Sequence, residues 1–117
     1  MQEESKISRR AVKALSSPGA RLFVSVVSIW EILLKRHAGK LLTTIDPDII
    51  VGTIRSSDSW RILPLETGHL QALNTLAHFR NHTDPFDRML IAQAHCEKLS
   101  IMTADARFSR YGIKIVW

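Results

Sequence analysis

The sequence His-Thr-Asp-Pro-Phe-Asp-Arg at residues 82–88 precedes an apolar helical pattern, and Thr103-Ala104-Asp105 closes a segment with the character of a strand. An acid directly before proline is a typical helix start, with the acid as the cap and proline in the first turn. Acids therefore stand at the start of a helix and at the end of the next strand. In a parallel α/β sheet both places lie at the carboxyl edge of the strands, where ligands and metals bind.

Helical and strand patterns alternate along the whole chain. We expect helices over residues 8–17, 25–39, 46–55, 67–77 and 84–99, and strands over residues 22–24, 60–65, 100–103 and 113–116. The predicted N-caps are Ser8, Ser25, Asp46, Thr67 and Asp84. This alternation predicts one α/β domain over residues 1–117, a three-layer α/β/α arrangement with a mostly parallel sheet in the middle. Right-handed crossovers would bring the strand-to-helix junctions to one edge of that sheet.

A third acid, Glu31, lies inside the helical pattern of residues 25–39, between apolar neighbours that predict a largely buried segment. A carboxylate near a core is unfavourable unless it is paired or bound to a metal. Together with Asp87 and Asp105 it gives acids at three separate junctions. Carboxylate oxygens are the ligands that Mg²⁺ and Mn²⁺ prefer, so the pattern favours a divalent-metal site.

Each acid also has an explanation that needs no metal. Asp84 can cap its helix, and Asp87 three residues later holds the capping-box position and favours the positive end of the helix dipole. Asp105 can cap a short turn that follows it. Glu31 can pair with Lys35 one helical turn further on. The metal site is favoured because these separate explanations would have to hold at three junctions independently.

The composition excludes several classes of protein. Of 117 residues, 45% are hydrophobic and 23% are charged, which argues against disorder. We expect no membrane span and no signal peptide, and the single cysteine, Cys96, fits a reducing cytoplasm. The formal charge of +5 favours a polyanionic partner such as nucleic acid, with an ordinary basic surface as the alternative. The histidines show no zinc-ligand spacing, and no glycine-rich nucleotide motif is present.

Several segments of the sequence resemble those of a known family. They are residues 24–32, 39–41, 63–65, 82–88 with 91–94, 103–105 and 111–117. In this order they resemble PIN-domain proteins, most closely the VapC-like toxins of bacterial toxin–antitoxin pairs. The resemblance runs through essentially the whole chain, and several of its motifs are long enough to be specific.

The resemblance implies an endoribonuclease that depends on Mg²⁺ or Mn²⁺, typically a homodimer held inactive by a small antitoxin protein. Glu31, Asp87 and Asp105 would be the catalytic and metal-binding acids, with Asp84 and Arg88 as accessory residues. The implied reaction is hydrolysis of RNA phosphodiester bonds. Arg88 would help to hold the RNA backbone, although it could also be a plain surface charge.

The sequence departs from this group at its N-terminus. Such proteins normally begin with an apolar strand that ends in an aspartate, the first metal ligand, and this central strand is apparently missing. Its absence would leave the neighbouring strands with unpaired edges. Either the start codon is assigned too late, or the gene is truncated.

Two other functions therefore stay open. If the gene is truncated, the chain would be an inactive PIN remnant that acts only as an antitoxin- or protein-binding module. A small α/β signalling domain with a phosphate-accepting aspartate is a third hypothesis. The sequence supports it least, because neither that aspartate nor the accompanying lysine is clear.

Overall fold

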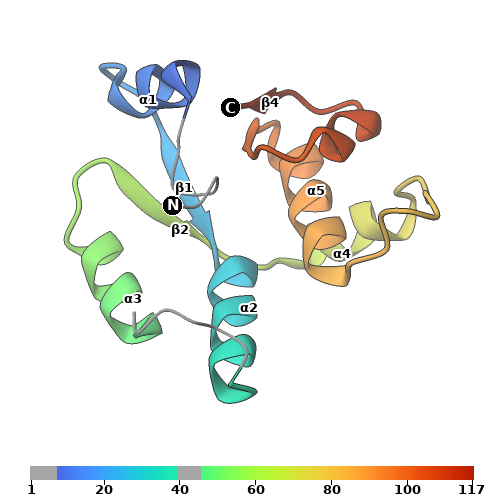
Figure 1. Cartoon of the computed structure of the whole chain (residues 1–117), viewed down its shortest axis with the longest axis horizontal. Helices are drawn as coiled ribbons and strands as arrows, with labels where there is room; N and C mark the ends of the chain where they lie inside the picture. The colour runs from blue at the N-terminus through green and yellow to red at the C-terminus, as the bar shows by residue number, and fades with distance from the viewer. Residues whose placement is uncertain (1–7, 40–45) are drawn as a thin grey trace.

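The computed structural model describes residues 8–39 and 46–117, and its elements follow the predicted alternation (Figure 1). They are α1 (Arg9–Ser16), β1 (Leu22–Ser25), α2 (Val26–His37), α3 (Pro47–Arg55), β2 (Trp60–Leu63), α4 (Thr67–Asn74), α5 (Pro85–Glu97), β3 (Ile101–Met102), the 3-10 helix η2 (Ala106–Tyr111) and β4 (Ile115–Val116). The predicted helices and strands are all present, with ends that shift by a few residues. Within the described ranges, no helix has the length and apolar character needed to cross a membrane.

Polar side chains fix the starts of most helices, as predicted. Side-chain oxygens accept first-turn backbone N–H groups at Ser8, Ser25, Asp46 and Asp84. Helix α4 differs, because its N-cap is Glu66 and the prediction of Thr67 is wrong by one residue. The backbone N–H of Glu66 donates to Nδ1 of the buried His69, 3.0 Å away. A side chain inside the helix therefore accepts the hydrogen bond of the N-cap residue's own backbone N–H.

The strands pair in parallel, which confirms the α/β class. Strand β1 pairs with β2, aligning Val24 with Ile62, and β3 pairs with β4, aligning Ile101 with Ile115. In the described part of the chain these are two separate two-stranded sheets rather than one continuous sheet. Strands β1 and β3 each have a described partner on one edge only, because no described strand bridges the two pairs.

The main hydrophobic core lies in the C-terminal half of the chain. Leu76, Ile91, Phe108 and Tyr111 form its buried cluster, drawn from the end of the α4 region, from α5 and from η2. Figure 1 shows α4, α5 and β4 on one side of the molecule and α1, β1, β2 and α3 on the other. Helix α2 contacts both α3 and α5, so the helix that carries Glu31 lies where the two groups meet.

Helix α2 is less buried than its apolar sequence predicted. Only Val27 and Ile29 are buried in it, whereas Trp30 is 52% exposed and Leu33 and Leu34 are also exposed. Within the described part of the chain, the elements that contact α2 leave several of its apolar side chains exposed. The expectation of a largely buried segment around Glu31 is therefore wrong.

Candidate metal centre

The start of α5 carries the first two predicted acids. Oδ1 of Asp84 accepts the backbone N–H of Asp87 at 2.9 Å, and Pro85 occupies the first turn. Asp84 is exposed and acts as the helix cap, whereas Asp87 is half-buried and turns toward the core of the C-terminal half. The capping interpretation of Asp84 is thereby confirmed. Its cap also fixes the backbone at Asp87.

Asp87 meets a histidine that the sequence did not single out. Nε2 of His82 lies 3.0 Å from Oδ2 of Asp87, and His82 is only 2% exposed. The imidazole ring packs between Phe108, 5.0 Å between centroids, and Tyr111, 5.5 Å between centroids. Oη of Tyr111 is 3.2 Å from Nδ1 of the same ring. Core packing therefore fixes the ring in position beside the carboxylate.

Asp105 brings a second carboxylate close to His82 and Asp87. It follows β3 and begins η2, where its Oδ1 accepts the backbone N–H of Arg107 at 2.9 Å. The Arg107 side chain binds the same carboxylate, with Nη2 2.6 Å from Oδ2 and Nε 3.0 Å from Oδ1. These hydrogen bonds lower the pKa of Asp105 to about 2. The carboxylate therefore stays ionised in any physiological buffer.

His82, Asp87 and Asp105 form the centre of the site. Each offers one ligand atom, and these atoms all lie within 4.8 Å of one another. Two of the three predicted metal-site acids are thus brought together by a helix start and a strand end, as their junctions indicated.

Glu31 lies beside this group rather than within it. Its carboxylate pairs with Nζ of Lys35 at 2.9 Å, the one-turn pair that the sequence allowed as an alternative. Glu31 is nevertheless close enough to act on Asp87. Burial raises the pKa of Asp87, the charges of Asp84 and Glu31 raise it further, and the hydrogen bond from His82 opposes them.

The donor atoms fit a divalent cation. Burial and, to a smaller extent, neighbouring negative charges raise the pKa of Asp87, and a cation at this point would offset both effects. Two carboxylates and an imidazole are suitable ligands for a metal such as Mn²⁺. Asp105 would have to exchange part of its contact with Arg107 for the ion.

Arg88 points away from this group into the protein. It is buried, and its Nη1 and Nη2 donate to the backbone carbonyls of Ala77 and Leu76 at 2.8 and 3.5 Å. The alternative of a plain surface charge is therefore wrong. Its guanidinium ties the first turns of α5 to the segment after α4, where carbonyl groups lack helical partners.

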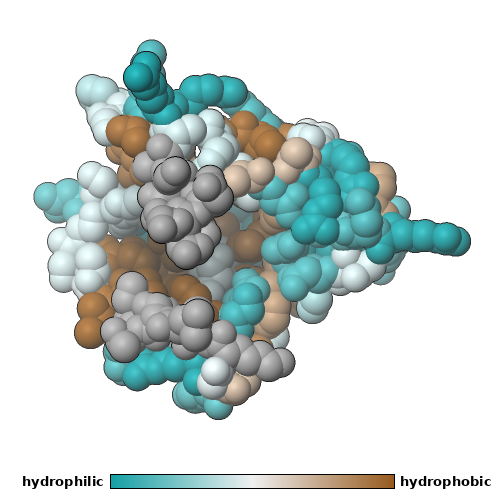
Figure 2. All heavy atoms as spheres, viewed as in Figure 1, coloured by the Kyte–Doolittle hydropathy of each residue, from teal (hydrophilic) through white to brown (hydrophobic). Residues whose placement is uncertain are grey.

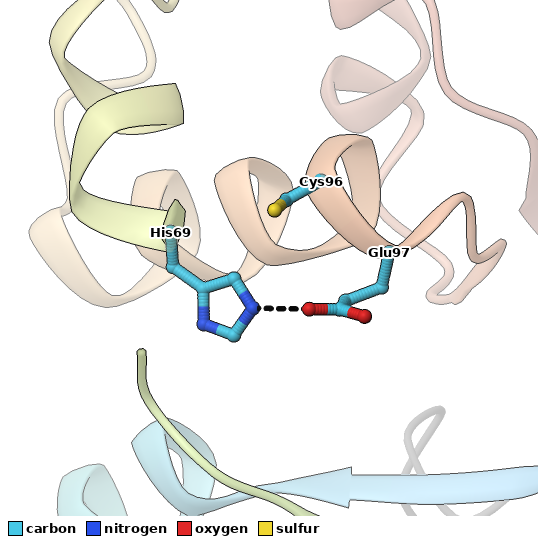
Figure 3. Close-up of side chains that lie close together, drawn as sticks. All are labelled: His69, Cys96 and Glu97. Carbon is cyan, nitrogen blue, oxygen red and sulfur yellow. Dashed lines mark hydrogen bonds and ion pairs between the residues drawn. The ribbon is translucent and has the colours of Figure 1, made fainter. Parts of the chain in front are cut away.

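A second group of potential ligands lies at the opposite end of α5. His69, Cys96 and Glu97 also present atoms within 4.8 Å of one another, with the thiol and the carboxylate directed toward the imidazole (Figure 3). Nε2 of His69 is 2.7 Å from Oε2 of Glu97. Because Nδ1 accepts the Glu66 backbone N–H, a neutral ring carries its proton on Nε2 and donates it to Glu97. That nitrogen has no free lone pair for a metal, so this group is a hydrogen-bonded clasp between α4 and α5.

Sequence reasoning missed three residues at the metal centre: His82, Arg107 and Tyr111. His82 lies inside the sequence of residues 82–88, but the histidines and the single cysteine form no complete zinc motif, so the sequence carries no metal signal for it. Arg107 and Tyr111 had no signal of their own, because their partners are distant in sequence or depend on the exact turn that η2 makes.

Comparison with known proteins agrees with the α/β fold. The PIN domain family matches residues 1–114, while no curated protein and no solved structure matches the chain. PIN domains are generally divalent-metal-dependent nucleases that act on RNA or DNA. The match spans nearly the whole chain and includes both converging aspartates. This chain therefore belongs to the PIN domain family.

Proposed function

We propose that this protein is an endoribonuclease of the VapC-like toxin type, which uses Mg²⁺ or Mn²⁺ bound at Asp87 and Asp105, with Glu31 as a further catalytic acid. The convergence of Asp87 and Asp105 carries the proposal, because their carboxylate oxygens lie within 4.8 Å of each other although they come from different elements. Membership of a family of nucleases gives the reaction class.

The chain's own residues would hold the ion and its surroundings in place. A bound divalent cation supplies an activated water molecule and stabilises charge on the leaving oxygen of the phosphodiester. Asp87 is fixed by the cap of α5, and Asp105 is fixed by its own capping contact with η2. Glu31 is proposed to complete the ligand set or to orient the water.

Basic groups beside the acids would hold the RNA backbone. Glu31 raises the pKa of Lys35 most strongly, with smaller contributions from Asp84 and Asp87, so this ammonium group is charged and close to the site. Arg110 is a second candidate, held by Asn81 at 2.8 Å and lying 4.3 Å over the ring of Phe79. Arg88 is proposed to act only as an accessory residue that steadies the start of α5.

A cleavage assay with RNA and DNA oligonucleotides tests this proposal. We expect RNA cleavage with Mg²⁺ or Mn²⁺ and none with EDTA. Asp87→Asn and Asp105→Asn should each lower the rate by at least about tenfold, since each removes a charged ligand. Asp58→Asn, at an exposed acid before β2, is the matched control. Cleavage that persists in a Glu31→Gln, Asp87→Asn double variant would rule out the assignment.

An exposed hydrophobic face supports the proposed protein partners. Trp30, Leu33 and Leu34 on α2 and Ile49 on α3 are exposed, and α2 contacts α3. Figure 2 shows hydrophobic side chains in brown at the lower left, where α3 lies in Figure 1. Large exposed apolar patches are typical of protein interfaces. We propose that this face binds the antitoxin or a second copy of the chain in a homodimer.

The same face favours a second candidate function, a PIN remnant that binds a protein partner without catalysis. Co-expression with the product of the neighbouring small gene distinguishes the two. Complex formation with metal-dependent cleavage by the freed protein supports the toxin, and complex formation without cleavage supports the binding module.

Two further expectations stay predictions. They are a single domain over residues 1–117 and a cytoplasmic location.

A further inference from the structure

We propose that His82 is itself a metal ligand, binding through Nε2 beside Asp87 and Asp105, so that the site prefers Mn²⁺ to Mg²⁺. The proposal rests on the metal-dependent function proposed above but adds a nitrogen ligand to a set of carboxylates. It is carried by the position, tautomer and burial of the imidazole ring.

The first observation is the spacing between His82 and Asp87. Nε2 and Oδ2 are 3.0 Å apart, which suits a hydrogen bond. Two neighbouring ligands of an octahedral ion, each about 2.1 Å from it, are also about 3 Å apart. An ion can therefore replace the shared proton while these two atoms keep their separation. Asp105, within 4.8 Å of both, would need a small movement to close the set.

The second observation concerns the proton on the ring. Oη of Tyr111 lies 3.2 Å from Nδ1 and 3.5 Å from the backbone oxygen of His82. A hydroxyl both donates and accepts, so it can accept a hydrogen bond from Nδ1–H while donating one to that oxygen. With an ion bound, the neutral ring can keep its one proton on Nδ1, and the Nε2 lone pair then binds the metal in place of the hydrogen bond to Asp87.

His69 shows why this freedom matters. Its Nδ1 faces a backbone N–H, which only donates, so its Nε2 must carry the proton. Both rings contact a carboxylate through Nε2, but only the Nδ1 of His82 faces a group that can accept a hydrogen bond. His82 can therefore hold its proton on Nδ1, and its Nε2 then exchanges the hydrogen bond to Asp87 for the ion. The hydroxyl of Tyr111 supplies the difference.

The third observation is that the ring cannot turn away. His82 is 2% exposed and packed against Phe108 and Tyr111, so its Nε2 stays directed at the acids. A contact that orients the second nitrogen of a histidine is the usual support for a metal ligand. Imidazole binds first-row transition metals better than Mg²⁺, which prefers oxygen and keeps its waters.

Electron spin-echo spectroscopy of Mn²⁺ bound to the intact chain tests the proposal, independently of cleavage. We expect modulation from a directly bound nitrogen, which changes when histidine is labelled with ¹⁵N. The signal should vanish in His82→Gln, and Mn²⁺ affinity should fall at least about tenfold. His78→Gln, at an exposed histidine, should retain both.

The outcomes separate this proposal from the proposed function. Mn²⁺ binding without nitrogen modulation in the unaltered protein, or modulation that survives His82→Gln, overturns the ligand even if RNA is cleaved. Modulation in a chain that cleaves no RNA supports the ligand and counts against the nuclease. Absence of any Mn²⁺ binding overturns both.

Discussion

The guanidinium of Arg107 contacts both carboxylate oxygens of Asp105, with Nη2 2.6 Å from Oδ2 and Nε 3.0 Å from Oδ1. The backbone N–H of the same arginine donates to Oδ1 as well. Arg107 therefore holds the position that a divalent cation would need beside Asp105. Loss of this contact should have opposite effects on metal binding and on stability.

Arg107→Gln should strengthen Mn²⁺ binding. The ion no longer competes with a guanidinium, and because an exposed ion pair is weak, the gain should be at most about fivefold. Isothermal titration calorimetry with Mn²⁺ measures it. Arg110→Gln is the control, because Arg110 contacts Asn81 rather than an acid. Weaker binding in Arg107→Gln would show that the arginine supports the site instead of competing.

Asp105 should make the stability of the protein depend on pH in the acid range. Its pKa falls from 3.8 to about 2 on folding, so its contribution is complete above pH 3.8 and is lost as the pH drops toward about 2. Both partners are partly exposed, so the contribution should stay below about 1 kcal/mol. Urea denaturation across this range should show that the free energy of unfolding depends less steeply on pH in Asp105→Asn. An unchanged pH dependence in this variant would contradict the assignment.

Asp87→Asn should stabilise the metal-free protein at neutral pH. Burial raises the pKa of Asp87, so folding disfavours its ionised form, and stability is lost as the pH rises above 3.8. Asparagine removes that cost and can still accept from His82. Excess Mn²⁺ should make the unaltered protein the more stable of the two. A ligand at a hundred times its Kd adds about 2.7 kcal/mol to the free energy of unfolding, and only the unaltered protein should gain it. Thermal melts with and without Mn²⁺ measure both effects.

The clasp at the far end of α5 should stabilise the fold without binding metal. His69→Ala removes a fully buried ring together with its hydrogen bonds to the Glu66 N–H and to Glu97, which should cost about 1–3 kcal/mol in the free energy of unfolding. Glu97→Gln keeps an acceptor for Nε2 and should cost less. Titration with Co²⁺ should give no thiolate charge-transfer band, in contrast to a cluster that ligates through Cys96. Such a band, lost in Cys96→Ser, would contradict the tautomer argued for His69.

Ile49→Arg should disrupt association while leaving the fold intact. Ile49 is 64% exposed, so the stability of the chain should change by no more than about 0.5 kcal/mol. A charge within a buried interface should weaken binding to the antitoxin or a second copy by about tenfold or more. Val12→Arg, at an exposed apolar residue of α1, is the control. Unchanged size-exclusion and co-purification behaviour in Ile49→Arg would show that this face is not the interface with the antitoxin or a second copy.

Local sequence signals predicted the elements and their starts well. Serine or aspartate before an apolar pattern identified most helix starts, because a cap satisfies backbone groups that the helix itself cannot. The junction rule also predicted that Asp87 and Asp105 would meet, since the ends of parallel strands share one edge. Local signals did not predict that Glu66 would be the N-cap of α4, because the acceptor of its backbone N–H is a side chain inside the helix.

Burial was harder to predict than secondary structure. The apolar sequence around Glu31 suggested a buried carboxylate, yet Trp30 and Leu34 are exposed because the described elements around α2 leave them uncovered. Arg88 shows the reverse case, since its charge suggested the surface while backbone carbonyls bind it inside. The hydrophobicity of a residue indicates whether burial is favourable for it, whereas the packing of the elements decides whether it is buried.

By itself the sequence determined the order of helices and strands, the parallel pairing and the two aspartates that meet, because caps, periodicity and junctions are local. Only the tertiary structure decided that His82 lies beside these aspartates, that Arg107 forms an ion pair with Asp105, and that Glu31 pairs with Lys35 outside the cluster. Those contacts depend on distances of a few ångströms between side chains from separate elements. Such distances follow from how the elements pack, and no local pattern encodes them.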